Sequence, residues 1–289
     1  MFGLRTWLRR RAAARAPVPD ALWMQALGRC RVIAHLDDAA LARLRELVTL
    51  FLVDKTISGA AGLELTEAMR LQIALQACVP ILELGIDSYA PWIEVIVYPD
   101  EFIVEREITD ENGIVHEVRE PLAGESWVEG PVILSWADIE SDAPEDGYNV
   151  ILHEFAHKLD MLDGQADGMP PLHAGMNRHD WHEAFANAFD DFERRVARVE
   201  RAERRAYRRW RLRAQHAGQD PAAEGAGCAL AQEQPLPLDP YAAHDAGEFF
   251  ACASEAFFET PQGLYADYPE VYRQLVRFYR QDPAGHGEA

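Results

Sequence analysis

Residues 153–157 read H-E-F-A-H, a pattern that places two histidines one helical turn apart with a glutamate beside the first. At about 100° of rotation per residue, His153 and His157 lie about 40° apart on one helix face, so both imidazoles can bind one zinc ion. Glu154 is then placed to accept a proton from a metal-bound water. The alternative interpretation is a pair of surface histidines on an amphipathic helix. We favour the first interpretation and predict a zinc-dependent hydrolytic site.

A hydrolytic zinc site needs a third protein ligand and one position left open for water. The helix predicted after Asp245 offers Glu248 and Glu255, which are seven residues apart and therefore share one face. The helix dipole favours the charge of Glu248 in the first turn, but spacing alone leaves Glu255 open as the ligand. Asp160, three residues beyond the second histidine, either supports a ligand or is a carboxylate that faces solvent.

The hydrophobic pattern predicts helical parts at both ends of the chain and a β-rich part in the middle. Residues 20–90 mostly follow the period of amphipathic helices, whereas residues 92–137 are rich in β-branched and aromatic residues between turn signals. We expect this middle part to form a small, mainly antiparallel sheet that meanders. Helical patterns then return, at about residues 146–162, 181–192, 246–259 and 269–280. We expect Asp146 to cap the first of these helices and Asp245 the third. The predicted fold class is α+β.

The length and local composition indicate one domain with a tail and an insertion. We predict a flexible basic tail over residues 1–19 and a single domain over residues 20–285. Residues 214–238 are poor in large apolar side chains, so we expect a mobile surface insertion there. The ten arginines from Arg194 to Arg213 indicate either a solvated helix face or a docking site for an acidic partner.

The overall charge and the cysteines limit the kinds of partner and compartment. A formal net charge of -20 argues against direct nucleic-acid binding, which needs a basic surface. No segment has the roughly eighteen uninterrupted apolar residues that a membrane span requires. The four cysteines form no C-x-x-C pair, and the N-terminus lacks the apolar stretch of a secretory signal. We therefore expect a cytoplasmic protein with reduced thiols.

Four longer motifs extend this interpretation: GPVILSW at residues 130–136, HEFAHKLD at 153–160, DPYAA at 239–243 and EFFA at 248–251. Matching spacing also occurs in PILELG at residues 80–85 and GIVH at 113–116. Together these motifs resemble those of the Mlc titration factor A family, which are bacterial zinc metallopeptidases. The resemblance covers about residues 20–283. The chain departs from the family in residues 200–238, which are longer here and begin in the arginine-rich run.

The resemblance implies a zincin-like fold, similar to the catalytic domain of anthrax lethal factor, with one Zn2+ per chain. By position in the motifs, it implies zinc ligands at His153, His157 and Glu248, with Glu154 as the catalytic base. It thereby favours Glu248 over Glu255 as the third ligand. Tyr241 matches a tyrosine near the metal that supports the transition state. His116 matches a histidine that approaches the zinc in a resting form.

The resemblance also implies an activity and a partner. Family members cleave small aminopeptidase substrates and bind the glucose repressor Mlc, so we expect a peptide substrate and a Mlc-like transcription repressor as partners. An alternative is that the protein chiefly sequesters a repressor and has weak or vestigial catalysis. A third interpretation is a zinc site that only stabilises the fold. In a peptidase, we expect the strand at residues 131–137 to be the sheet edge that receives an extended peptide.

Overall fold

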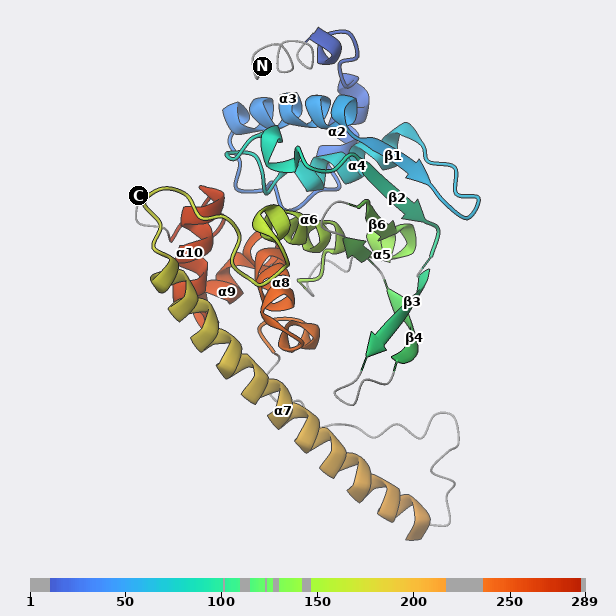
Figure 1. The fold of residues 1–289 in the computed structure, drawn as a ribbon, viewed down its shortest axis with the longest axis vertical. Helices are drawn as coiled ribbons and strands as arrows, with labels where there is room; N and C mark the ends of the chain where they lie inside the picture. Colours follow the sequence, from blue (N-terminus) through green and yellow to red (C-terminus); the bar gives the residue numbers. More distant parts are fainter. Residues whose placement is uncertain are drawn as a thin grey trace.

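The computed structural model describes residues 11–100, 102–109, 115–122, 124–126, 130–141, 147–216 and 236–286. Helices lie at both ends of the chain and strands in the middle, the order of an α+β fold (Figure 1). The strands are β1 (Thr56–Gly59), β2 (Glu94–Tyr98), β3 (Phe102–Thr109), β4 (Val115–Leu122), β5 (Gly124–Ser126) and β6 (Val132–Ser135). The helices are α2 (Asp20–Leu27), α3 (Asp38–Asp54), α4 (Glu67–Cys78), α5 (Trp136–Ser141), α6 (Val150–Asp160), α7 (Arg178–His216), α8 (Ala246–Glu259), α9 (Pro261–Asp267) and α10 (Pro269–Tyr279). Short 3-10 helices are η1 (Ile86–Tyr89), η2 (Met161–Asp163) and η3 (Pro240–Ala243).

Helices α2, α3 and α4 pack together at one end of the molecule (Figure 1). Local caps determine where α3 and α4 begin. The Asp37 carboxylate accepts a hydrogen bond of 2.7 Å from the backbone N–H of Ala40, and the Thr66 hydroxyl accepts one of 3.2 Å from Met69. The predominantly helical character predicted for residues 20–90 is therefore confirmed, although the short strand β1 was not predicted.

The sheet differs from the predicted antiparallel meander. Its four strands have the order β1-β2-β6-β5, in which β1 and β6 both run parallel to β2 and only β5 is antiparallel to its neighbour. Strands β3 and β4, which come between β2 and β6 in the sequence, form an antiparallel hairpin that is separate from this sheet (Figure 1). After this hairpin the chain re-enters the sheet at β5, which runs opposite to β2, and β6 then runs in the direction of β2. Side-chain alternation is the same for both strand directions, so the sequence pattern does not distinguish them.

Strand β6 is an interior strand of the sheet. It pairs with β2 on one side and with β5 on the other, where Val132 lies opposite Ser126. Both of its hydrogen-bonding sides are therefore occupied, and the prediction that residues 131–137 form the edge that receives a peptide is wrong. The strand also ends at Ser135, because Trp136 begins α5.

Helix α6 crosses the centre of the fold, and all its residues are buried. The Phe155 ring packs against three aromatic rings with centroids 5.8, 5.2 and 5.4 Å away, those of Phe51, Tyr89 and Trp92. Such a cluster fixes the rotation of the helix about its axis. His153 and His157 lie about 160° round the helix from this anchor, on the face that meets α8.

Helix α7 has 39 residues. Its first turns pack against α8 and α10, where Trp181 is fully buried and its indole N–H donates a hydrogen bond of 2.9 Å to the Gly168 carbonyl. The later turns project beyond the rest of the molecule (Figure 1). Helix α7 therefore extends the helix predicted around residues 181–192 through the arginine-rich run.

Parts of two predicted segments lie outside the described residues. These are the first ten residues of the predicted basic tail and residues 217–235 of the predicted insertion. Both segments contribute a residue to the hydrophobic core close to the point where they meet the domain. These residues are Val18 and Leu238, each 7% exposed. Among the helices of the described ranges, none is long and apolar enough to cross a lipid bilayer.

Candidate metal centre

Asn149 determines where the histidine-bearing helix begins. Its side-chain oxygen accepts a hydrogen bond of 3.0 Å from the backbone N–H of Leu152, so the helix starts at the next residue rather than near Asp146, which is not described. The Asn149 amide nitrogen donates to Gln76 at 2.6 Å and to Glu259 at 2.7 Å. These contacts join α4, α6 and α8, and α8 supplies the acidic side chains of the site.

The start of α8 lies close to the loop that follows α6. Gly168 in this loop has φ +78°, and a Cβ there would be 2.4 Å from the carbonyl oxygen of Ala246. Only glycine allows this close approach. The predicted cap is confirmed, since the Asp245 carboxylate accepts a hydrogen bond of 2.9 Å from the backbone N–H of Glu248. Glu248 therefore lies in the first turn of α8.

Three side chains from α6 and α8 bring potential ligand atoms together. Oε2 of Glu248 is 3.0 Å from Nε2 of His153 and 3.3 Å from Nε2 of His157. The two Nε2 atoms are 3.1 Å apart. Tetrahedral zinc, with bonds of about 2.0–2.1 Å to nitrogen and oxygen, holds its ligand atoms about 3.3 Å apart. The spacing of these three atoms therefore fits one zinc ion.

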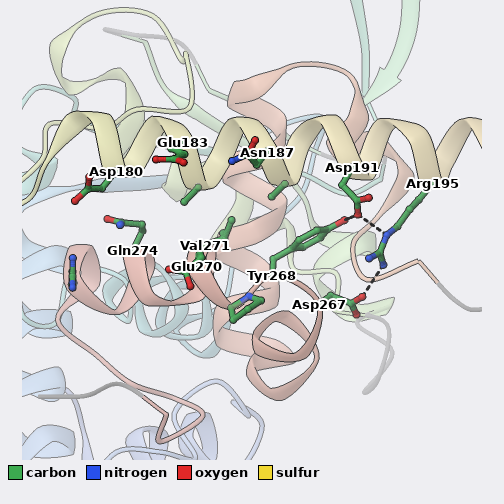
Figure 2. A pocket seen from close by; sticks show the side chains of 14 residues that line it. Asp180, Glu183, Asn187, Asp191, Arg195, Asp267, Tyr268, Glu270, Val271 and Gln274 are labelled. Carbon is green, nitrogen blue, oxygen red and sulfur yellow. Dashed lines mark hydrogen bonds and ion pairs between the residues drawn. The ribbon is translucent and has the colours of Figure 1, made fainter.

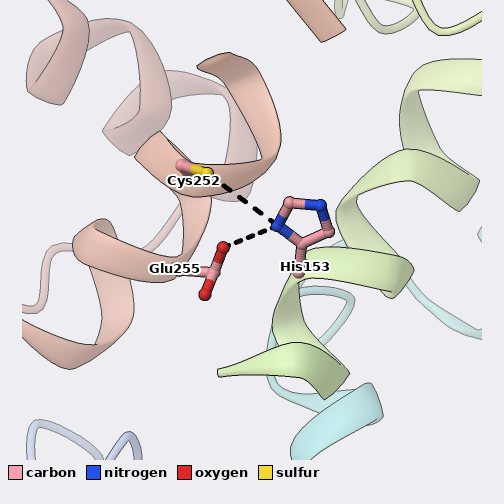
Figure 3. A group of neighbouring side chains, drawn as sticks. All are labelled: His153, Cys252 and Glu255. Carbon is pink, nitrogen blue, oxygen red and sulfur yellow. Dashed lines mark hydrogen bonds and ion pairs between the residues drawn. The ribbon is translucent and has the colours of Figure 1, made fainter. Parts of the chain in front are cut away.

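Glu255 lies against the other nitrogen of the His153 ring (Figure 3). Its Oε1 is 2.6 Å from Nδ1, and its Oε2 accepts a hydrogen bond of 2.6 Å from the backbone N–H of Asn149. The Cys252 sulfur is also 3.9 Å from Nδ1. An imidazole that binds a metal through Nε2 carries its proton on Nδ1 and donates it to such a carboxylate. Of the two candidate carboxylates, Glu248 is thus the one that faces both Nε2 atoms.

The charges of these groups depend on one another. Burial lowers the pKa of His153, but the Glu255 carboxylate and hydrogen bonds outweigh burial and raise this pKa well above its ordinary value. Burial raises the pKa of Glu248, but hydrogen bonds from His153 and His157 outweigh burial and lower it. The site therefore holds carboxylate charge that suits a divalent cation, and protons on its imidazoles compete with the metal.

Glu154 is only 4% exposed, and it interacts with the charge of Lys158 one turn along α6. Burial lowers the pKa of Lys158 to about 8, although the Glu154 carboxylate acts in the opposite direction. The Lys158 ammonium donates a hydrogen bond of 2.9 Å to the Gly130 carbonyl. This contact ties the histidine-bearing helix to the chain just before β6.

Tyr241 and His116, the two predicted auxiliary residues, are described to different extents. Tyr241 lies on η3, directly before α8, and its ring centroid is 6.3 Å from that of His153. Its side of the site is open, since the residue is 48% exposed. His116 lies on β4 opposite Ile108, but the position of its side chain is outside the described part of the chain. Its predicted approach to the metal therefore stays a prediction.

Comparison with known sequences identifies the family. The model of the family described as glucose-regulated metallo-peptidase M90 matches residues 4–280. The chain belongs to this family. Proteins called Mlc titration factor A are similar to it over most of their length. One from Klebsiella pneumoniae subsp. pneumoniae is 35% identical over 266 residues, which cover 90% of this chain and 86% of that protein. One from Cronobacter sakazakii is 34% identical over 282 residues, covering 96% of this chain and 91% of that protein.

Asp160 lies three residues beyond His157 and is fully buried, so the interpretation as a solvent-facing carboxylate is wrong. Its Oδ2 accepts a hydrogen bond of 2.8 Å from the backbone N–H of Gly168. Burial raises the pKa of Asp160 to about 7, although this hydrogen bond acts in the opposite direction. Asp160 therefore holds the loop that packs against the start of α8.

The contacts around this candidate site were only partly predictable. Spacing placed Glu255 on the face of Glu248 but could not tell which nitrogen of the His153 ring each carboxylate would meet. Asn149 was missed because Asp146 offered an equally good capping residue type. The sequence did contain a signal for the observed cap. Asn149 is also a common capping residue type, and it lies three residues before Leu152, from whose N–H it accepts a hydrogen bond.

Proposed function

We propose that the chain is a zinc-dependent peptidase. The observation that carries this proposal is the convergence of Nε2 of His153, Nε2 of His157 and Oε2 of Glu248. One Zn2+ bound by these atoms would polarise the scissile carbonyl and acidify a water molecule. Membership of a metallo-peptidase family supports the same class of reaction.

In this proposal Glu154 is the general base. It follows the first ligand histidine in α6 and accepts the proton of the attacking water, then delivers it to the leaving amine. Tyr241 donates a hydrogen bond to the oxyanion that develops on the carbonyl. Its 48% exposure and its place 6.3 Å from the His153 ring favour this role over that of a packed aromatic.

His116 has a restraining role in the proposed cycle. A neutral imidazole can complete four-coordinate zinc, which would leave no position for the attacking water. The strand pair β3–β4 that carries His116 stands apart from the four-stranded sheet, so it can move without breaking the sheet's pairing. A peptide or partner that binds the open form better would then shift the population toward activity.

The substrate we propose is a small peptide, cleaved in the manner of an aminopeptidase in the cytoplasm. The name Mlc titration factor A, shared by relatives at about 35% identity, supports a second role in binding a Mlc-like repressor. The alternative function is sequestration of such a repressor with weak catalysis. Repressor binding by E154Q, compared with wild type, distinguishes the two functions. If E154Q binds the repressor as tightly as wild type but hydrolyses no peptide, sequestration does not depend on catalysis.

Zinc content and hydrolysis measured on the same preparations test the proposed function. Wild type should contain about one zinc per chain and hydrolyse an aminopeptidase substrate, and a chelator should abolish both. Glu248→Ala should lose zinc and activity, whereas Glu64→Ala, at an exposed carboxylate far from the site in sequence, should keep both. Hydrolysis that persists after complete removal of the metal would refute the proposal.

A further inference from the structure

Helix α7 separates its charges along its length. Residues 178–193 contain five acidic side chains and one arginine, a formal charge of -4. Residues 194–213 contain ten arginines and two glutamates, a formal charge of +8. We call these parts the acidic half and the basic half of α7. The acidic half packs on the domain, whereas the basic half is the part that projects from it (Figure 1).

The opposite charges of the two halves lie on the same face of α7. Eighteen residues make five full helical turns, so side chains at this spacing point in the same direction. The acidic residues Asp180, Glu183, Asp190 and Asp191 are followed eighteen residues later by Arg198, Arg201, Arg208 and Arg209. All of these side chains are exposed except the half-buried Asp191. One accessible stripe is therefore acidic along the first half and basic along the second.

The acidic half borders a groove of about 780 Å³ between α7 and the segment formed by α9 and α10 (Figure 2). Asp180 and Glu183 line it from α7, and Glu270 lines it from α10. Arg195 at its end already pairs with Asp191 and Asp267, each at 2.7 Å. The groove shows that carboxylates beside α7 accept arginine side chains, and several of these carboxylates remain exposed.

The basic half carries charge that the described part of the chain does not balance. Arg198, Arg201, Arg205, Arg208 and Arg209 form no ion pair with any described side chain. They recur at spacings of three and four, at which like charges destabilise a helix. An anionic surface along this stripe would remove that repulsion.

We propose that two copies of this chain pair through α7 in antiparallel orientation, each basic half lying along the acidic half of the other. In a register centred on Arg194, Arg208 lies opposite Asp180 and Arg205 opposite Glu183 of the other copy. Two-fold symmetry repeats each of these contacts. The two Arg194 side chains meet near the axis, where Asp191 of the same chain, at 3.8 Å, offsets their charge.

A second copy fits the basic half better than a nucleic acid or a membrane does. The rest of the chain has a formal charge of -28, which repels polyphosphates. A helix that lies on a membrane needs an apolar face opposite its cations. Here that face carries Val199 and Trp210. It also carries Glu200 and Glu203, whose charges oppose burial in lipid. The acidic half of a second α7, lying antiparallel, provides opposite charge along a helix segment of similar length.

Sedimentation velocity of the full chain tests this pairing. The Debye length falls from about 10 Å at 0.1 M salt to about 3 Å at 1 M, so the dimer should form at low salt and dissociate at high salt. The variants D180R/E183R and R205E/R208E should each raise the dimer dissociation constant about tenfold or more, because each changes four contacts per dimer. E46R/E64R alters two exposed glutamates outside α7 and should dimerise like wild type.

An equimolar mixture of D180R/E183R and R205E/R208E is the decisive sample. In a mixed dimer the unaltered halves face each other, and the reversed halves again meet opposite charge. The mixture should therefore regain the affinity that each variant alone has lost. A wild type that stays monomeric at low salt, or a mixture that associates no better than its components, would overturn the proposal. So would a monomeric chain whose basic half binds duplex DNA.

Discussion

Replacing Glu255 by glutamine should weaken zinc binding without removing a ligand. The Glu255 carboxylate accepts two hydrogen bonds of 2.6 Å. One comes from the Nδ1–H of His153 and the other from the backbone N–H of Asn149. A glutamine has only one oxygen, so its amide N–H2 must face one of these two donors. The variant therefore loses the charge that orients His153 and also creates a donor–donor contact in a buried place, since the Glu255 side chain is 3% exposed.

Loss of such a carboxylate behind a ligand histidine typically lowers metal affinity about 10–100-fold, or about 1.4–2.7 kcal/mol. Competition with a chromophoric chelator at fixed pH measures this change directly. Glu259→Gln is the matched control, because Glu259 is also on α8 and also accepts from Asn149, but through the side-chain amide at 2.7 Å. It should leave zinc affinity nearly unchanged.

Two results would contradict this role of Glu255. If E255Q and E259Q bind zinc equally well, the contact with Nδ1 does not support the ligand. If E255Q loses zinc as completely as a His153→Ala variant, Glu255 is itself a ligand and the assignment of Glu248 must be revised. Circular dichroism of the zinc-free variants, which should match wild type, separates either result from a loss of folding.

Three further predictions concern the base, the restraint and a buried acid. E154Q should keep about one zinc but lose about 10²–10⁴-fold in turnover, and wild-type turnover would exclude Glu154 as the base. At saturating zinc, H116A should retain the metal with unchanged or higher turnover, and a collapse of activity would contradict a restraining role. The pKa of Asp160 is raised to about 7, above about 3.9 in the unfolded chain, so its contribution to stability falls as pH rises between these values. D160N should remove up to about 4 kcal/mol of this pH dependence in urea unfolding of the zinc-free protein, and identical pH profiles would contradict it.

The sequence predicted those elements whose ends depend on local chemistry. Asp245 marks the start of α8, Pro261 follows its end, and Pro269 marks the start of α10. The structure places these helix ends within a residue or two of the prediction. The histidine-bearing helix was predicted for the same reason, except for its first turn. Capping and periodicity depend on neighbouring residues, so they can be read without the fold.

Features that depend on distant parts of the chain were predicted less well. The direction of β6 depends on the path of the β3–β4 hairpin, which the alternation of β6 does not encode. Strand β1 has only four residues and contains Gly59, so its sequence carries little strand signal. The contact between Glu255 and His153 joins residues 102 positions apart and depends on how α6 and α8 are rotated.

Anomalous diffraction at the zinc edge, from crystals of the zinc-loaded protein, tests the proposed zinc site most directly. We expect a single strong peak within bonding distance of Nε2 of His153, Nε2 of His157 and a Glu248 oxygen, about 2.0–2.2 Å from each. A second group of potential ligands lies on the other side of the same ring, formed by Nδ1 of His153, Cys252 and Glu255. A peak within that second group, or no peak near α6, would contradict the proposed catalytic zinc site.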